Sequence, residues 1–217
     1  EAAEDFYRVE KKTRKTKNDG AWMNFPSVSL FSSTANADLT KFFKRMGCEA
    51  STNAYSITGS TPLVDSLLSV RYALYSEYIP NTDLVNYIQE SGGTYLYENL
   101  YTLPLGFVLP YDLADNWQYQ MENPAEVQND LCLLLGTDDV LVPVETEVSG
   151  SGCTFTADMA GEYYVYIQNK KVKNVKAFLP SGEKNFSNVD RGYLLEMGNL
   201  SEGSRITLTP GESGETL

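Results

Sequence analysis

The chain has 217 residues, with 17 Lys and Arg against 29 Asp and Glu, and a formal net charge of −12. It contains no histidine, which excludes a Ser-His-Asp triad, a Cys-His dyad and a histidine-built zinc or iron site. Its 42% hydrophobic and 12% aromatic content is typical of a folded protein. We therefore expect a globular chain with no catalytic residues, no metal site and no cofactor of its own.

The charge is unevenly distributed along the chain. Six of the 17 basic residues lie between Arg8 and Lys17, whereas residues 72–169 contain 15 acids and no Lys or Arg. Because neutralising phosphates needs clustered cations, we expect no nucleic-acid partner. The basic run has two interpretations: a solvated turn beside a strand, which we favour, or a contact with an anionic surface.

The first elements follow from alternation, periodicity and capping signals. Residues 6–10 alternate like a strand, and residues 22–26 are predicted to form a buried loop. An apolar stripe over residues 39–46 predicts a helix that Asn36 or Asp38 caps, because a short polar side chain accepts free N–H groups of the first turn. The next predicted segments are a helix over 63–70, a strand over 72–75, a short helix or strand over 82–89, strands over 94–97 and 105–109, and a helix over 123–135.

Past residue 140 the sequence shows only short strand signals separated by Gly, Ser and Asn turns. The predicted strands cover residues 140–148, 153–157, 163–168, 172–179, 193–197 and 205–209. This spacing is typical of an antiparallel sandwich. We predict an α+β N-terminal domain, residues 1–139, followed by an antiparallel β-sandwich (jelly-roll-like) domain, residues 140–217. The abrupt ends of the sequence suggest a piece of a longer protein, with the second domain truncated at its C-terminus.

Searches for catalytic motifs leave one class of enzyme open. Neither a phosphate-binding glycine loop nor G-x-S-x-G occurs. A glycosidase needs only two carboxyl groups about 5–10 Å apart, but 29 acids produce such pairs by chance. We favour solvated loop acids over catalysis for these groups. The candidates are Glu98 and the pairs Asp112/Asp115, Asp138/Asp139 and Glu145/Glu147.

Aromatic side chains offer a second kind of chemistry. Fifteen Tyr and two Trp are present, and their flat apolar faces match sugar rings while their O–H and N–H groups bind hydroxyls. For most of them we favour core packing, since alternating Tyr also reflects β propensity. Trp22 and Trp117 lie in predicted loops. The three cysteines are widely spaced, and we favour buried free thiols over a disulfide framework.

Five segments occur in an order that resembles a known family. They are F-Y-R-V-E (6–10), S-L-F-S-S-T (29–34), D-S-L-L-S-V-R-Y (65–72), Y-E-N-L-Y-T-L-P-L-G-F (97–107) and E-N-P-A-E-V-Q-N (122–129). Together they resemble the extracytoplasmic region of the YfhO family of bacterial polytopic membrane proteins. One departure is Ser69, where the family usually has Gly, and this puts a local turn in doubt.

The resemblance implies a membrane protein similar to GT-C glycosyltransferases. Such proteins transfer a sugar from a lipid-linked donor, in this family to lipoteichoic acid or another envelope polymer outside the membrane. It implies that this chain is a domain at the extracytoplasmic face of the bacterial cell membrane, with the catalytic acids elsewhere in the parent protein. The implied partners are the parent's own membrane segments and an envelope polysaccharide or teichoic-acid-type acceptor.

The matched segments also have a physical interpretation. Asp65 lies in a first helical turn, Arg71 is expected to pair with Glu98 or Asp65, and Asn99 is expected to hold a turn. We favour a structural network here over an acceptor-binding cleft. The candidate ligand-binding residues are Trp22, Asp65, Arg71, Tyr97, Glu98 and Asn99.

Three functions follow from these observations. The leading hypothesis is a non-catalytic extracytoplasmic domain of a glycosyltransferase-like membrane protein that acts in acceptor binding or assembly. The alternative is a secreted pair of glycan-binding modules without transferase activity. The third is a two-carboxylate glycosidase.

Overall fold

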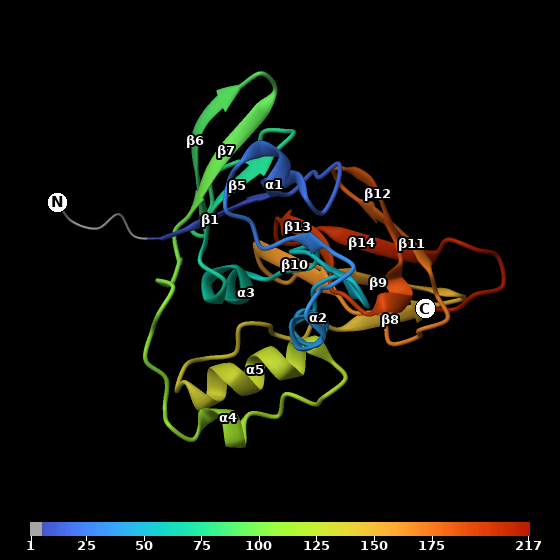
Figure 1. Cartoon of the computed structure of the whole chain (residues 1–217). Helices are drawn as coiled ribbons and strands as arrows, with labels where there is room; N and C mark the ends of the chain where they lie inside the picture. Colours follow the sequence, from blue (N-terminus) through green and yellow to red (C-terminus); the bar gives the residue numbers. More distant parts are fainter. Residues whose placement is uncertain (1–5) are drawn as a thin grey trace.

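The computed structural model describes residues 6–217, which are mostly sheet with a few short helices (Figure 1). The strands of the N-terminal part are β1 Arg8–Lys11, β2 Leu30–Phe31, β3 Ala50–Ser51, β4 Ala54–Tyr55, β5 Val70–Tyr75, β6 Val85–Ser91 and β7 Thr94–Asn99. They form a four-stranded sheet of order β1-β5-β7-β6 and a small sheet of order β2-β4-β3. Only the β1–β5 pairing is parallel among these described strands.

The helices are α1 Asp19–Met23, α2 Ala37–Arg45, α3 Pro62–Leu67, α4 Leu113–Asn116 and α5 Pro124–Leu134. Short polar side chains start three of them. Asn36 accepts two backbone N–H groups at α2, Thr61 accepts one at α3, and Asn123 accepts one at α5. The helices predicted over residues 39–46 and 123–135 are therefore confirmed, and the helix predicted over 63–70 is present but ends at Leu67.

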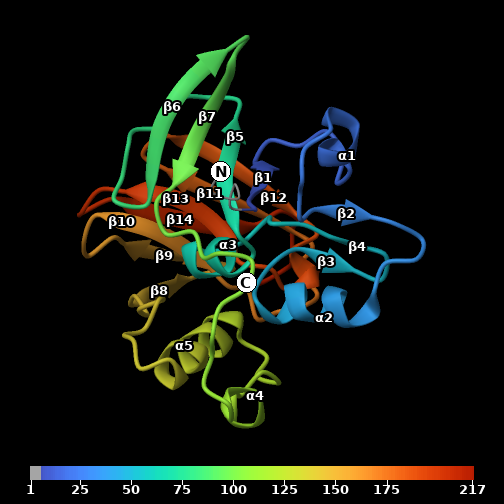
Figure 2. The same cartoon turned by 60° about the vertical axis from the view of Figure 1, so that its left-hand side comes forward.

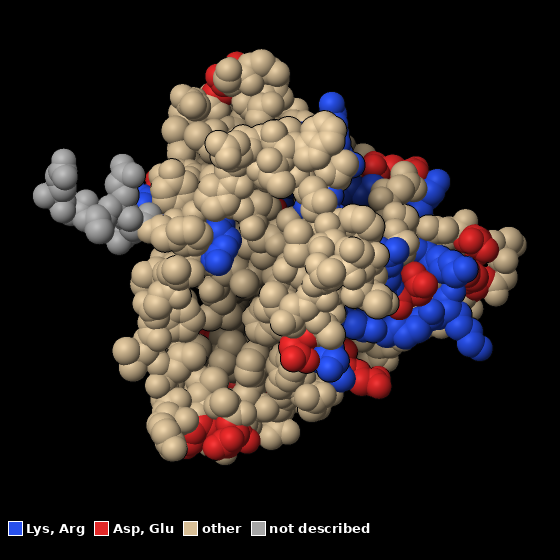
Figure 3. Space-filling model, in the orientation of Figure 1, with Lys and Arg blue, Asp and Glu red and all other residues tan. Residues whose placement is uncertain are grey.

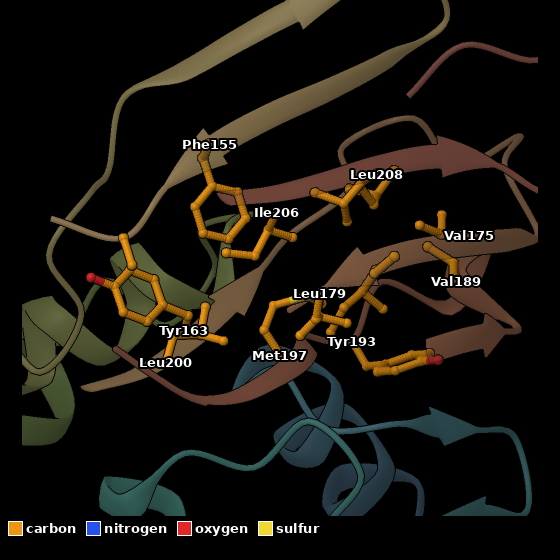
Figure 4. Close-up of a cluster of buried hydrophobic side chains, with 14 of the residues drawn as sticks. Phe155, Tyr163, Val175, Leu179, Val189, Tyr193, Met197, Leu200, Ile206 and Leu208 are labelled. Carbon is orange, nitrogen blue, oxygen red and sulfur yellow. The ribbon is translucent and has the colours of Figure 1, made fainter. Parts of the chain in front are cut away.

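The C-terminal part consists of strands β8 Thr146–Ser149, β9 Gly152–Thr156, β10 Gly161–Val165, β11 Asn174–Leu179, β12 Gly182–Ser187, β13 Leu195–Leu200 and β14 Arg205–Pro210, with a 3-10 turn, η1 Val189–Arg191. A five-stranded antiparallel sheet has the order β12-β11-β14-β9-β8, and β10 pairs with β13. Side chains from both sheets share one hydrophobic core, which includes Phe155, Tyr163, Met197, Leu200, Ile206 and Leu208 (Figure 4). The β-rich character is confirmed, and the jelly-roll-like arrangement stays a prediction.

A second hydrophobic core lies in the N-terminal part. It is built by α2, α3, α5 and the β3–β4 hairpin, with Phe43, Met46, Tyr55, Val64 and Val127 among its buried side chains. Phe43 stacks on Tyr55 with ring centroids 4.4 Å apart, which fixes α2 against the hairpin. Of the apolar side predicted for this helix, Phe43 and Met46 are buried and Phe42 is partly buried, whereas Leu39 is 45% exposed.

The two parts of the chain also contact each other. The Leu194 N–H donates to the Gly47 carbonyl at 2.8 Å, and Glu49 forms an ion pair with Arg191. Gly59 lies at the same joint, with backbone atoms so close that a Cβ would lie 2.6 Å from the Leu194 carbonyl oxygen. The two separate cores favour a division of the chain into two domains, whereas the packed contact between the parts favours a single unit. The domain boundary at residues 139/140 therefore stays a prediction.

The structure corrects several predictions of local structure. Residues 105–109 form no strand, because Pro104 and Pro110 on either side of them lack an N–H for a sheet and the segment is largely exposed. The predicted buried loop at residues 22–26 is wrong, since Trp22 is 87% exposed and belongs to α1. Residues 82–89, left open between helix and strand, contribute to β6.

The basic run between Arg8 and Lys17 is not the solvated turn that we favoured. The Lys12 side chain is only 15% exposed and forms ion pairs with Asp65 at 3.4 Å and Glu196 at 3.8 Å. Arg8 donates to the Leu68 carbonyl at 2.7 Å. These cations are used to join distant parts of the chain, which sequence proximity alone did not reveal.

Candidate functional site: a hollow beside Trp22

A hollow of about 490 Å³ lies at the edge of the small sheet. Its walls come from the segment before α1, from α1, from β2 and from the β3–β4 hairpin, which lie one below another in Figure 2, and from η1 of the C-terminal part. It is lined by Thr16, Lys17, Asn18, Trp22, Phe31, Ser51, Asn53, Ala54 and Arg191. The site therefore combines two aromatic rings, two cations and several hydroxyl and amide groups.

Asn18 joins two walls of the hollow. Its side-chain NH₂ donates to the Phe31 carbonyl at 3.0 Å, and its Oδ1 accepts the Phe31 N–H at 2.8 Å. The amide thus forms the two hydrogen bonds with the Phe31 backbone that a neighbouring strand would form. This reciprocal pair holds α1 beside β2, with Trp22 and Phe31 on the same hollow.

Asp19 shapes the segment that supplies Thr16 and Lys17. Its carboxylate accepts the backbone N–H groups of Lys15 and Thr16, both at 2.9 Å, and the Thr16 hydroxyl at 3.0 Å. Burial alone would raise the pKa of Asp19, but these hydrogen bonds, together with the charge of Lys11, lower it below its ordinary value. The carboxylate is therefore held ionised within a tight loop.

Glu49 fixes both cations of the hollow. It forms ion pairs with Lys17, at 2.9 Å, and with Arg191 of the C-terminal part. Burial acts to raise the pKa of Glu49, but hydrogen bonding and charge attraction from Lys17, then attraction from Arg191 and Arg14, lower it. Two cations facing one carboxylate leave a local excess of positive charge at the hollow.

Both aromatic rings of the site are largely exposed. Trp22 is 87% exposed and Phe31 is 54% exposed, although large apolar side chains normally bury most of their surface. An open indole face beside amide and hydroxyl groups matches the two sides of a sugar, whose ring C–H groups stack on aromatics and whose hydroxyls form hydrogen bonds. Among the described residues no group of three or more His, Cys, Asp or Glu side chains could hold a metal ion.

Trp22 is the one sequence-predicted candidate that lines this hollow. Arg71 pairs with Glu98 across β5 and β7 at 3.0 Å, as predicted. Tyr97 is fully buried, and its hydroxyl contacts both the N–H and the carbonyl of Ile79 at 2.8 Å. Asn99 accepts the Tyr101 N–H at 3.1 Å and so holds a turn, again as predicted. Their ligand-binding role stays a prediction.

Asp65 takes part in a separate buried cluster where the two parts of the chain meet. Burial acts to lower the pKa of Lys12, but attraction to Asp65 and Glu196 raises it well above its ordinary value. Burial likewise raises the pKa of Asp65, with Lys12 acting against the shift. Tyr75 borders the cluster, and burial raises its pKa to about 12. These groups face one another inside the protein, apart from the Arg71–Glu98 pair, and the ligand-binding role of Asp65 stays a prediction.

Sequence reasoning missed most of the residues that line the hollow. Thr16, Lys17 and Asn18 are close to Trp22 in sequence, so a polar stretch before an isolated Trp was a usable signal. Ser51 and Asn53 lie in a hairpin far along the chain, and Arg191 comes from the other part of the molecule. No spacing rule connects these segments, because the fold alone brings them together.

Two of the recognisable segments are joined by a buried carboxylate. Glu10, 1% exposed, accepts the Ser29 N–H at 2.8 Å and the Ser29 hydroxyl at 2.9 Å, together with groups from Ser27 and Val28. Residues 6–10 and 29–34 therefore depend on each other for hydrogen bonding.

The fold and site describe a β-rich domain with an aromatic and polar hollow, and comparison with known families assigns it to a class of bacterial membrane proteins. The family described as bacterial membrane protein YfhO matches residues 1–140. The chain therefore belongs to the YfhO family, as its segments predicted. No curated protein and no solved structure matches the chain. Within residues 6–217, no helix combines the length and hydrophobicity needed to cross a bilayer.

Proposed function

We propose that the chain is an extracytoplasmic domain of a glycosyltransferase-like membrane protein and that the hollow beside Trp22 binds a sugar unit of an envelope polymer. The single observation that carries this proposal is an indole ring, 87% exposed, on a hollow lined by hydroxyl and amide groups. Membership of a bacterial membrane protein family supports the location. The domain would hold the acceptor while transfer takes place elsewhere in the parent protein.

The geometry gives each lining group a role in this binding. The Trp22 face stacks on a sugar ring, and the side chains of Ser51 and Asn53 bond its hydroxyls. Lys17 and Arg191, held by Glu49, attract an acidic or phosphorylated substituent of the polymer. This charge matters because the protein as a whole carries −12 and would repel an anionic polymer elsewhere.

Tryptophan fluorescence tests the proposal directly, because the chain has only two Trp residues. Trp117 is partly buried, and its indole N–H donates to the Val127 carbonyl at 2.9 Å, so Trp22 reports on the hollow. Titration with soluble teichoic-acid fragments and with neutral oligosaccharides should shift the emission. Trp22→Ala should weaken binding, measured by calorimetry, by about tenfold, which corresponds to about 1.4 kcal/mol.

Tyr78→Ala is the matched control, since Tyr78 is an exposed aromatic residue in another part of the molecule. It should leave the affinity unchanged. Equal loss of affinity in the two variants, or no binding of any envelope polymer fragment by the wild-type chain, contradicts the proposal. Binding of neutral oligosaccharides alone would favour the glycan-binding module over the acceptor-binding domain.

A further inference from the structure

Residues 100–111, which we call the apolar loop, connect β7 to α4 and contain no charged residue. In Figure 1 this loop runs down the side of the molecule opposite to the C-terminal strands. The same side of the space-filling view has few charged atoms, whereas Lys, Arg, Asp and Glu gather over the C-terminal strands (Figure 3). A face with so few charges is unusual in a protein whose net charge is −12.

The side chains of the apolar loop point into solvent. Val108 and Tyr111 are completely exposed, at 98% and 102%, and Leu105 is exposed at 60%. Most other members of the loop are also large, apolar or aromatic and exposed. Isolated exposed apolar residues need no explanation, but a contiguous run of them marks an interaction surface.

The loop is anchored at both ends. At its start the Leu103 N–H donates to the Ser66 carbonyl at 3.3 Å, and the Ser66 hydroxyl donates to the Tyr101 carbonyl. At its end Leu113 is buried in the N-terminal core. The two prolines at 104 and 110 remove backbone donors, so the loop also lacks the pairing capacity of an edge strand.

Exposed residues near the N-terminus extend this surface. Phe6 and Tyr7 are exposed, and the Arg8 that follows them donates its backbone N–H to the Ser69 carbonyl at 2.8 Å. The segment 66–69 is thus bonded by the start of β1 on one side and by the apolar loop on the other. Residues 6–7 and the apolar loop, which are far apart in sequence, therefore both carry exposed aromatic rings next to segment 66–69.

We propose that the apolar loop inserts its side chains into the headgroup–acyl boundary of a lipid bilayer and seats the domain on the membrane. The family to which the chain belongs is one of membrane proteins, so a bilayer is the apolar phase nearest to it. An acidic protein is repelled by anionic lipid, so close contact is most favourable for the face with the fewest charges. The mixture of Tyr, Phe, Leu and Val is that of membrane interfaces.

The backbone of the loop sets the depth of insertion. Its residues form no helix or sheet, so the N–H and C=O groups that are not bonded at its two ends need water or headgroup partners. The side chains therefore reach the acyl region while the backbone stays among the headgroups. Binding of this kind depends on apolar area and is insensitive to salt.

Vesicle flotation tests the proposal with the full chain. Vesicles of phosphatidylcholine alone, and of phosphatidylcholine mixed with phosphatidylglycerol, are floated with wild-type protein at low and high salt. Wild type should float with the neutral vesicles at both salt concentrations. Val108→Asp and Tyr111→Ser should each reduce the bound fraction, with an apparent partition coefficient about tenfold lower for Val108→Asp.

Val148→Asp is the matched control, because Val148 is 78% exposed on β8, outside the apolar loop. It should float like wild type, and all variants should keep the wild-type urea denaturation midpoint, which shows that they are folded. The proposal is overturned if wild type binds neither vesicle, if Val148→Asp loses binding equally, or if wild type is a dimer that Val108→Asp converts to a monomer. Binding that requires phosphatidylglycerol and disappears at high salt also overturns it.

Discussion

Ser69 has a backbone conformation that its side chain does not favour. Its φ is +54°, in the left-handed region, where the chain leaves α3 and enters β5. Its hydroxyl is buried and has no hydrogen-bond partner among the described residues. A Cβ in this region costs about 1 kcal/mol, and a buried hydroxyl without a partner adds a further cost. The position is therefore better suited to glycine.

Replacing Ser69 by Gly should raise the free energy of unfolding by about 1 kcal/mol. The variant removes the Cβ strain and the unpaired hydroxyl, and the added freedom of the unfolded glycine offsets part of this gain. Urea denaturation measures the change. Ser69→Ala separates the two causes, since it removes the hydroxyl and keeps the Cβ. A Gly variant less stable than wild type would show that the side chain has a stabilising contact.

This position also shows how sequence and structure meet at the scale of one residue. The departure of Ser69 from the family's usual Gly marked a local turn, and the structure shows the left-handed residue that such a turn requires. The sequence predicted that Arg71 forms an ion pair with either Glu98 or Asp65. In the structure its ion-pair partner is Glu98. The choice between these two acids depends on the register of β5 against β7, and the sequence does not specify that register.

Among the secondary-structure elements, Asp19 controls the loop that enters α1 and supplies one wall of the hollow. Its folded-state pKa is lowered, so the ionised form is bound more strongly in the folded protein than in the unfolded chain. The stabilisation is present above the unfolded pKa, about 4, and is lost as pH falls through the lower folded pKa. The contribution of Asp19 to the free energy of unfolding should therefore be large at neutral pH and small in acid.

Asp19→Asn should lower the free energy of unfolding at neutral pH by about 1–3 kcal/mol, because an amide replaces an acceptor-only group that takes three hydrogen bonds. The difference from wild type should shrink in acid, where the wild-type carboxylate is protonated. Urea denaturation at neutral pH and well below pH 4 measures both values. Asp38→Asn, at an exposed carboxylate on α2, is the control and should have little effect. A difference independent of pH would contradict the charge argument.

Elements with local signals were predictable, and those that depend on distant partners were not. The caps Asn36 and Asn123 sit directly before their helices, so α2 and α5 could be predicted. Residues 105–109 have the composition of a strand, but flanking prolines and the absence of a partner strand among the described residues leave them irregular. A strand forms only when a partner strand can hydrogen-bond to it, and the local sequence does not predict whether the fold supplies that partner.

For the whole molecule, the candidate site depends on how the two parts of the chain meet. Arg191 reaches the hollow from η1, and Glu49 of the N-terminal part holds it. Lys12 makes a second connection, to Glu196 on β13. These contacts join residues more than one hundred positions apart. Trp22 could therefore be proposed from the sequence, but the set of residues that surrounds it could not. One tightly packed position in this joint is a glycine.

Gly59 provides the clearest test of the joint. A Cβ there would lie 2.5 Å from the Gly47 carbonyl oxygen and 2.6 Å from that of Leu194, and its φ is +81°. Backbone atoms on both sides cannot move aside as a flexible side chain would. Gly59→Ala should therefore lower the free energy of unfolding by about 3 kcal/mol, from left-handed strain plus overpacking. It should also weaken ligand binding at the hollow, because Arg191 is displaced relative to Glu49.

Gly93→Ala separates these two causes. Gly93 has a φ of +74°, but no atom lies within 4 Å of the place that a Cβ would take, so an Ala there adds strain without a clash. It should cost about 1 kcal/mol and leave binding at the hollow unchanged. Urea denaturation and calorimetric titration of both variants measure the comparison. If Gly59→Ala proves no more destabilising than Gly93→Ala, the two parts of the chain do not need this close contact, and the hollow is formed by the N-terminal part without a fixed Arg191.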